Sequence, residues 1–330
     1  IAIYNTKTKR LLVARDSLGQ KPLYWYIDHE KFLFSSDIRS LKGYANGLDQ
    51  EAIKVFLNLS YIPAPFTIYS NISKVNPGEI IEIDFDESGR INHKNSVFRF
   101  DMVTKRKFSD HWKKILVSDV PVALSLSGGI DSSLVLAIDG RHSKAIGATF
   151  TLNSKFSEKS LQRESSIANK FAARHKTIHT KVELDPTTIN EYFKVFSEPF
   201  GDSSAFALNN IALQVKGKYK VLIGGDAADE LFAGYRKHLA LRFFMLTKRL
   251  RANKILSRIV GGKFEQLVTS KTTLDGYLSL LEMGLAENEV RWLMNSPKYS
   301  LKAVLSKRIS LSRMNKNFNC FLSVYSPDSI

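Results

Sequence analysis

A buried strand that runs into a glycine turn and then a helix is the feature that most constrains this fold. The apolar run "VPVALSL" ends at Leu126 and is followed by "SGGIDSS" at 127–133 and the helical stretch "SSLVLAIDG". Two further apolar runs, "AIGATFTL" and "KYKVLIGG", alternate with the helical stretch "RESSIANKFAARH". Short apolar strands that alternate with helices predict a parallel α/β sheet in this part of the chain.

The first hundred residues have a different pattern. Residues 1–40 alternate apolar and polar positions around the turn stretches "NTKTK" and "IDHE", which predicts β-hairpins. Helical spacing follows in "DQEAIKVFLNL", and "EIIEIDFDESGRI" is typical of another strand. The segment "YIPAPFTIYSNISKVNPGE" contains three prolines and is interpreted as a connection. A polar, basic stretch, "TKRKFSDHW", predicts a domain boundary near residue 100, and the chain after residue 231 reads as helical.

Composition excludes several classes of protein. The single cysteine, Cys320, excludes a disulfide framework and a cysteine-rich zinc site, and it agrees with a reducing cytoplasm. No apolar stretch has the length that a membrane span needs. The net charge of +16 comes from dispersed basic residues, so we interpret it as a solvated surface around an anionic small substrate. The basic stretch at 239–260 has apolar residues at helical spacing and is interpreted as a surface helix.

The stretch "SGGIDSS" is a candidate polyanion site. Helix N-termini present unpaired N–H groups, glycines allow close approach of the backbone, and Ser127, Ser132 and Ser133 add hydroxyl donors. The alternative is a plain strand–turn–helix junction with polar capping. The loop lacks the lysine of a Walker A motif. The loop contains Asp131 instead, and a carboxylate at this position is suited to binding a Mg²⁺ ion that also contacts the phosphates. This combination favours a cradle for pyrophosphate as a leaving group, with attack at the α-phosphorus.

A second glycine-ended strand occurs in "VLIGGDAADELFAGY". Gly224 and Gly225 precede a predicted helix that carries Asp226, Asp229 and Glu230. Asp226 and Asp229 are three residues apart, so we expect them to share a helix face. Capping of a helix start by acidic residues is the alternative. Because ligands bind at the carboxyl ends of parallel strands, we expect both glycine loops at one site.

These motifs resemble a known family. The stretch "LSLSGGIDSS" closely resembles the pyrophosphate loop of the glutamine-dependent asparagine synthetases. The stretches "EPFGDSSA" at 198–205 and "GGDAADELFAGY" at 224–235 resemble two further blocks of that family, in the same order. The stretches "LLVARDSLGQKPLYWY", "FLFSSDIRSL" and "YIPAPFTIYSNISKVNPGE" resemble the second half of its glutaminase domain and the interdomain segment. The resemblance covers almost the whole chain.

The resemblance implies a fold and an activity. Residues 1–100 would form the second half of an N-terminal-nucleophile (αββα) glutaminase domain with the interdomain segment. Residues 101–330 would form an α/β synthetase domain of the PP-loop, adenine-nucleotide α-hydrolase type, with a helical C-terminal part. ATP would adenylate the side-chain carboxylate of aspartate, pyrophosphate would leave, and ammonia from glutamine would displace AMP to give asparagine.

The resemblance also implies cofactors, partners and site residues. ATP and Mg²⁺ would be the cofactors, and aspartate and either glutamine or ammonia would be the other substrates. The enzyme would be cytoplasmic and would have no nucleic-acid or membrane partner. A homodimer is compatible with the resemblance. Asp226 would assist formation of the acyl-adenylate, and Asp131 and Asp229 would bind the metal. The positions implied in binding ATP or pyrophosphate are Ser125, Ser127, Gly128, Gly129, Asp131, Ser132, Leu152, Gly224 and Gly225. Of these, Leu152, placed just after the strand "GATFT", and Gly224 and Gly225 would contact the adenosine part.

The sequence also departs from the family. The family's glutaminase nucleophile is an N-terminal cysteine, whereas this sequence begins with Ile1, and we find no counterpart of the family's C-terminal catalytic lysine. We therefore expect a fragment without glutaminase activity. Gly224 stands where a serine is commoner. Three alternatives remain open: a relative that amidates a sugar acid or closes a lactam, an inactive fragment that binds nucleotide or a partner, and a nucleic-acid binder. The last predicts steeply salt-dependent binding to any duplex.

Overall fold

Two compact units make up the chain. The computed structural model describes residues 1–85, 91–97, 118–142, 144–153, 159–232, 234–235, 240, 270, 278, 280–281 and 283–308. Unit 1 combines Ile1–Phe100, Phe196–Gly201 and Asp229–Ile330, and unit 2 combines Asp101–Val195 and Asp202–Ala228. The predicted boundary stretch at 104–112 lies outside the described residues, as does the predicted basic helix at 239–260 apart from residue 240. Within the described part of the chain, no helix is both long and apolar enough to cross a membrane.

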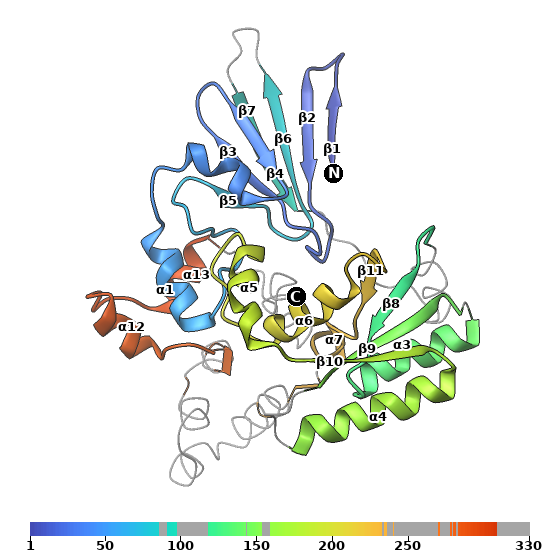
Figure 1. The fold of residues 1–330 in the computed structure, drawn as a ribbon. Coiled ribbons are helices and arrows are strands. Elements are labelled where there is room, and N and C mark those ends of the chain that lie inside the picture. Colours follow the sequence, from blue (N-terminus) through green and yellow to red (C-terminus); the bar gives the residue numbers. More distant parts are fainter. Residues whose placement is uncertain are drawn as a thin grey trace, which may run out of the picture. The chain divides into compact units, whose positions relative to one another are not determined.

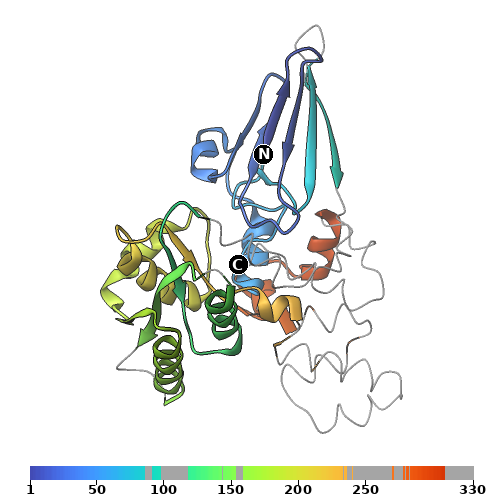
Figure 2. The ribbon, with the colours of Figure 1, turned by 90° about the vertical axis from the view of Figure 1, so that its right-hand side faces the viewer.

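Unit 1 contains two antiparallel sheets. The first has the order β1-β2-β6-β7, and Figure 2 shows its long strands side by side. The second has the order β4-β3-β5. Val13, Ile81 and Ile83 of the first sheet are fully buried and pack with Trp25 and Phe32 of the second. The bounds are β1 (Ala2–Asn5), β2 (Arg10–Ala14), β3 (Tyr24–Ile27), β4 (Phe32–Ser35), β5 (Ser73–Lys74), β6 (Glu79–Phe85) and β7 (Ile91–Val97). The predicted hairpins are confirmed as β1–β2 and β3–β4.

Helices form a second core in unit 1. The predicted helix is confirmed as α1 (Gln50–Leu59), and it starts at Asp49, whose carboxylate accepts hydrogen bonds from the Glu51 and Ala52 amides. Such a cap satisfies amides that have no partner within the helix. Val55 and Leu59 of α1 pack with Val290 of α12 (Glu287–Leu293) and with α13 (Leu301–Arg308). The short 3-10 helix η1 (Ile38–Tyr44) packs at the second sheet.

The segment 61–79 is more than a connection. Its Phe66 and Thr67 are fully buried, and its strand β5 pairs with β3. The Thr67 hydroxyl, which donates to the Ile72 carbonyl over 2.7 Å, closes the segment on itself. Prolines signalled an irregular path correctly, and the segment that connects α1 with β6 also supplies core side chains of unit 1.

Unit 2 is a parallel α/β layer structure. Its sheet has the order β10-β9-β8-β11, and all neighbouring strands are parallel, which confirms the prediction. Helices α3 and α4 pack on one face and α6 on the other (Figure 1). The bounds are β8 (Val122–Ser125), α3 (Ile130–His142), β9 (Ile146–Asn153), α4 (Lys159–His175), β10 (Ile178–Glu183), η2 (Pro186–Thr188), α5 (Ile189–Val195), α6 (Ser203–Val215) and β11 (Val221–Ile223).

Gly128 lets the turn after β8 lie directly on α4. Its φ is +82°, a left-handed backbone conformation that side chains with a Cβ rarely adopt. A Cβ at this position would collide with the Glu164 carbonyl oxygen and would lie 3.1 Å from the Ala168 nitrogen. Both atoms belong to the backbone of α4 and cannot move aside easily. The shape of the turn therefore depends on glycine at this position.

We predict that Gly128→Ala lowers the free energy of unfolding by about 2 kcal/mol or more, from backbone strain and overpacking together. Gly147→Ala is the matched control, because Gly147 lies in β9 and a Cβ there would meet nothing within 4 Å. Its effect should stay within about 0.5 kcal/mol. Urea titrations of both variants give the comparison. Equal unfolding midpoints for the two variants would contradict the assigned backbone contact.

Candidate functional site

Two neighbouring strands of unit 2 end at the same edge of the sheet in a glycine pair. β8 runs parallel to β11, with Leu124 opposite Ile223. Gly128 and Gly129 stand three and four residues after the end of β8, and Gly224 and Gly225 follow β11 directly. Because the strands are parallel, both loops leave from their carboxyl ends, the edge at which open α/β sheets bind ligands.

Gly225 brings the second loop against the first turn of α3. A Cβ on Gly225 would lie 2.7 Å from the Ser132 nitrogen and 3.2 Å from the Asp131 Cβ. Real Cβ atoms do not approach backbone nitrogen so closely, so only glycine permits this packing. The loop at 127–133, which we call the glycine loop, thus lies between the α4 backbone and the chain that follows β11. Its two walls fix its shape.

Hydroxyl groups brace the glycine loop from inside. The Ser132 hydroxyl accepts a hydrogen bond from the Ser127 amide over 3.2 Å and lies 3.0 Å from the Ser127 hydroxyl. The Gly129 amide donates to the Ser127 hydroxyl over 3.2 Å. The Ser132 side chain belongs to a residue that is only 3% exposed, whereas Ser127 is exposed. In this arrangement Ser132 stabilises the loop, and Ser127 faces solvent.

The start of α3 has the donors that a polyphosphate needs. The first backward hydrogen bond at this helix start runs from the Ser133 amide to the Gly129 carbonyl, over 3.2 Å. The amides at the start of any helix have no partner within it, and the helix dipole adds positive potential there. Together with the exposed Ser127 hydroxyl and the close-packed glycines, these amides are the kind of donor set that binds anions at helix starts.

The same position suits a hard metal ion that arrives with phosphate. Asp131 is half-buried in the first turn of α3, next to the anion-binding amides. Among the residues that the structure describes, no group of three or more His, Cys, Asp or Glu side chains could hold a metal ion. Mg²⁺ commonly keeps waters and binds through one or two carboxylates plus substrate phosphates. The donor set therefore fits Mg²⁺ bound with a polyphosphate.

Two sequence-based placements are corrected by the structure. Asp226 is exposed in the turn before α7 (Ala228–Phe232), so Asp226 and Asp229 do not share a helix face as predicted. The reason is Ala227, whose φ of +70° keeps the helix from starting earlier. Leu152 lies within β9 and not after it, because the strand continues to Asn153. Ser125, in contrast, lies where expected, at the end of β8.

Asp229 folds with unit 1, whereas Asp131 and Asp226 fold with unit 2. Within unit 1, the Asp229 carbonyl accepts a hydrogen bond from the Gly234 amide over 2.9 Å, which closes the turn after α7. The Tyr235 hydroxyl donates to Glu230 over 2.7 Å. A joint role of Asp131 and Asp229 as metal ligands stays a prediction.

Sequence reasoning missed two supporting features of the site. Glu164 and Ala168 form the α4 wall of the glycine loop through backbone atoms, and no side-chain pattern signals such a role. Asp202 begins α6 by accepting a hydrogen bond from the Ser204 amide over 2.8 Å. The signal for this cap was present in "GDSSA", because an acidic residue before a helical run is a typical N-cap.

Two family models match the chain. The model described as asparagine synthase matches residues 104–314, and the model described as glutamine amidotransferase domain matches residues 1–94. The first match alone covers more than half of the 330 residues.

Curated relatives agree with these matches. The chain is 30% identical over 262 residues to glutamine-hydrolyzing asparagine synthetase 1 of Bacillus subtilis, which covers 73% of this chain and 40% of that protein. It is 28% identical over 259 residues to a putative glutamine-hydrolyzing asparagine synthetase 2 of Methanocaldococcus jannaschii. This match covers 72% of this chain and 49% of that protein. The chain therefore spans about half or less of these relatives.

Likeness to solved structures is weak. An NH3-dependent NAD synthetase from Campylobacter jejuni is 19% identical, with 64% of this chain and 95% of that chain covered and a TM-score of 0.29, too low to carry an argument. The family models decide the question. With its parallel-sheet unit and its antiparallel amidotransferase part, the chain belongs to the asparagine synthase family, joined to a glutamine amidotransferase domain.

Proposed function

We propose that this chain is the nucleotide-using part of an ATP-dependent, amide-forming ligase. The observation that carries the proposal is the glycine loop: a strand end without a Walker lysine, with Asp131 at the helix start and Gly225 packed against the Ser132 amide. Such a loop suits the pyrophosphate portion of ATP. The family membership of the chain supports the same reading.

Each group of residues has its own role in the proposed reaction. The α3 first-turn amides and the Ser127 hydroxyl hold the β- and γ-phosphates, and Ser132 keeps the loop in that shape through its bonds to Ser127. Asp131 would hold Mg²⁺, and the ion would supply neutralisation of the negative charge on pyrophosphate. Donors that are already in place need no reorganisation when negative charge develops on the leaving group, and this is often the largest part of catalysis. Leu152, Gly224 and Gly225 border the adenosine side, and Asp226 assists adenylate formation.

The proposed acceptor is the side-chain carboxylate of aspartate, and the proposed nitrogen donor is glutamine through ammonia. The names of the curated relatives support this choice, although the chain covers only part of their length. We also propose that the chain divides into a glutaminase-family part at 1–100 and a synthetase part at 101–330. A relative that acts on another carboxylate is the second candidate, and acceptor dependence separates the two.

The products of ATP cleavage test the reaction class. With the full-length protein, aspartate and MgATP, we predict AMP and pyrophosphate, because the loop holds the two terminal phosphates as one leaving group. ³¹P NMR of the reaction mixture identifies the products directly. ADP and inorganic phosphate would refute the proposed reaction. If pyrophosphate is released with another carboxylate but not with aspartate, the proposed acceptor is wrong and the proposed cleavage of ATP stands.

Substitution of the acidic residues tests their roles. Asp131→Asn and Asp229→Asn should weaken MgATP binding about tenfold or more, because an amide oxygen is a poorer ligand for a hard dication. Asp226→Asn should bind MgATP within about twofold of the parent and release pyrophosphate much more slowly. Stability losses should be about 1 kcal/mol or less, from the lost charge at a helix start.

Asp119→Asn is the matched control, because Asp119 is an exposed acidic residue before β8, in the unit that also holds Asp131 and Asp226. Calorimetric titrations with and without Mg²⁺, run beside thermal melts, separate binding from stability. If all variants melt slightly lower and bind MgATP like the parent, the acidic residues are helix caps, and the assigned roles are wrong.

A further inference from the structure

The block "EPFGDSSA" at 198–205 belongs to both units. Phe196–Gly201 packs within unit 1, whereas the residues on either side, Val195 and Asp202, pack within unit 2. We call Phe196–Gly201 the crossover. The chain therefore leaves the synthetase-family unit for six residues and returns to it at Asp202, the residue that caps α6. The proposed nucleotide site gives this block no role, so its contacts need an explanation of their own.

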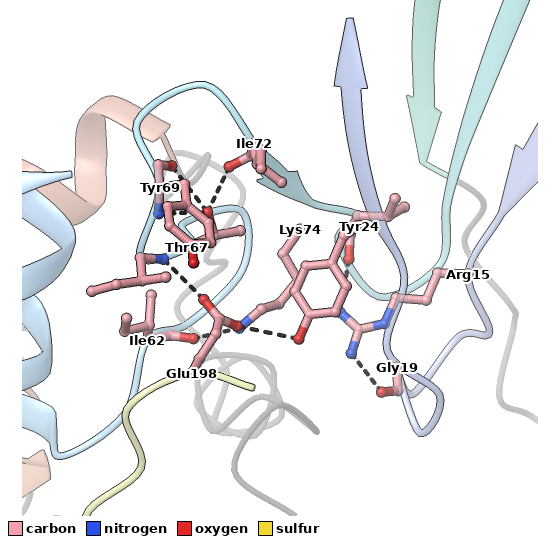
Figure 3. Close-up of polar contacts among 11 residues, drawn as sticks. Arg15, Gly19, Tyr24, Ile62, Thr67, Tyr69, Ile72, Lys74 and Glu198 are labelled. Carbon is pink, nitrogen blue, oxygen red and sulfur yellow. Dashed lines mark hydrogen bonds and ion pairs between the residues drawn. The ribbon is translucent and has the colours of Figure 1, made fainter. Parts of the chain in front are cut away.

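Glu198 is the buried centre of the crossover (Figure 3). Its side chain is 10% exposed, and one carboxylate oxygen accepts a hydrogen bond from the Ile68 amide over 2.9 Å. The other oxygen accepts from the Tyr24 hydroxyl over 3.2 Å and lies 3.2 Å from the Lys74 ammonium. Both oxygens thus have partners, all of them in the part of unit 1 that precedes residue 100.

Lys74 is buried to the same degree as Glu198. Its side chain is 9% exposed, and its ammonium donates to the Ile62 carbonyl over 2.7 Å and lies 5.9 Å from the centre of the Tyr24 ring. In the described residues, Glu198 is the one carboxylate within ion-pair distance of Lys74. Lys74 is also held by its backbone, because β5 pairs it with Tyr24 of β3. Unit 1 therefore presents a fixed, buried cation to the crossover.

A second contact holds the other end of the crossover. The Gly201 amide donates to the Ser60 carbonyl over 2.7 Å, and a Cβ on Gly201 would lie 3.0 Å from the Ser60 Cβ. Within the crossover the rings of Phe196 and Phe200 stack with their centres 5.1 Å apart. The crossover is thus attached at Glu198 and at Gly201, with only Pro199 and Phe200 between them.

We propose that the Lys74–Glu198 pair is the anchor that fixes the crossover to the first hundred residues of unit 1 and completes the core of that unit. A buried charge without a partner is costly, and removal of one member of a buried pair costs far more than removal of both. Lys74 therefore makes docking of Glu198 a condition for a stable unit 1. Glu198 lies within the asparagine synthase match at 104–314, yet its partners Tyr24, Ile68 and Lys74 lie within the amidotransferase match at 1–94.

The anchor has a consequence for how the chain can be divided. A fragment that ends near residue 100 leaves Lys74 without its carboxylate, the Ile68 amide without its acceptor and the Ser60 carbonyl without the Gly201 donor. The crossover also ends one residue before Asp202. Release of the crossover thus frees the chain on the N-terminal side of α6. None of this depends on the nucleotide chemistry proposed for unit 2.

Hydrogen exchange on the 330-residue chain tests the anchor. The variants are Glu198→Gln, Lys74→Met and the double variant, and the reporters are the amides of Gly201 and Ile68, whose hydrogen bonds hold the crossover. The Leu126 amide, which donates to the Phe150 carbonyl over 2.7 Å, reports on unit 2. Glu198→Gln should speed exchange at Gly201 and Ile68 at least tenfold and leave Leu126 within twofold of the parent.

The pair should also be coupled. Lys74→Met should have a smaller effect than Glu198→Gln, because Glu198 keeps the Ile68 and Tyr24 donors. The double variant should exchange more slowly at Gly201 than the product of the two single effects predicts, since it leaves no unpaired buried charge. The control is the exposed pair Glu191–Lys194, whose side chains are 61% and 72% exposed and whose variants Glu191→Gln and Lys194→Met should change nothing.

If Glu198→Gln fails to fold, Tyr24→Phe removes one donor to Glu198 and should raise exchange at the same two amides by a smaller factor. The proposal is overturned if the double variant changes the exchange rate at Gly201 by the product of the two single effects. It is also overturned if exchange at Leu126 rises as much as at Gly201, or if exchange at Gly201 does not change. Selective and coupled exchange at the crossover supports it whether or not the chain binds ATP.

Discussion

The parallel pairing of β8 with β9 on one side and β11 on the other is the constraint on which the candidate site depends. It brings two glycine-ended strands to one edge of the sheet. The close contacts at Gly128 and Gly225 then hold the glycine loop between backbone atoms of α4 and the chain after β11. Because these walls are backbone, the loop amides are in place before any ligand binds. A preorganised donor array of this kind is what stabilisation of a departing pyrophosphate requires.

Unit 1 contains charged side chains that are buried in its interior. Arg15 is 7% exposed, and its guanidinium donates to the carbonyls of Lys21, Val75 and Gly19 over 2.9, 2.7 and 2.7 Å. These bonds shape the stretch "RDSLGQK". Lys74 and Glu198 form the second buried polar centre. A buried ion pair contributes little net stability but strongly penalises alternatives that break it, so its main effect here is to specify one path of the chain.

Local sequence patterns predicted what local physics determines. The apolar run before "SGGIDSS" and the helical spacing after it correctly indicated β8, the turn and α3, and Asp49 before "QEAIKVFLNL" marked the start of α1. The glycines in the sequence indicated a tight turn. The reason why Gly128 must be glycine could not be predicted, because its contact with Glu164 exists only once α4 has packed.

The failures have physical causes as well. The left-handed φ of Ala227 moved Asp226 out of the helix, and alanine gives no sequence signal for such a conformation. The role of Glu198 was invisible because Tyr24 is 174 residues away in the sequence, so the contact follows only from the tertiary fold.

Binding of inorganic pyrophosphate to the isotope-labelled chain, followed by amide NMR, tests the central claim most directly. The account predicts that pyrophosphate with Mg²⁺ shifts the amides at 127–133 and the Gly225 amide more than any others, and that AMP shifts those amides much less. The largest shifts elsewhere in the chain, or loop shifts caused by AMP but not by pyrophosphate, would contradict the assignment of the glycine loop as a pyrophosphate cradle.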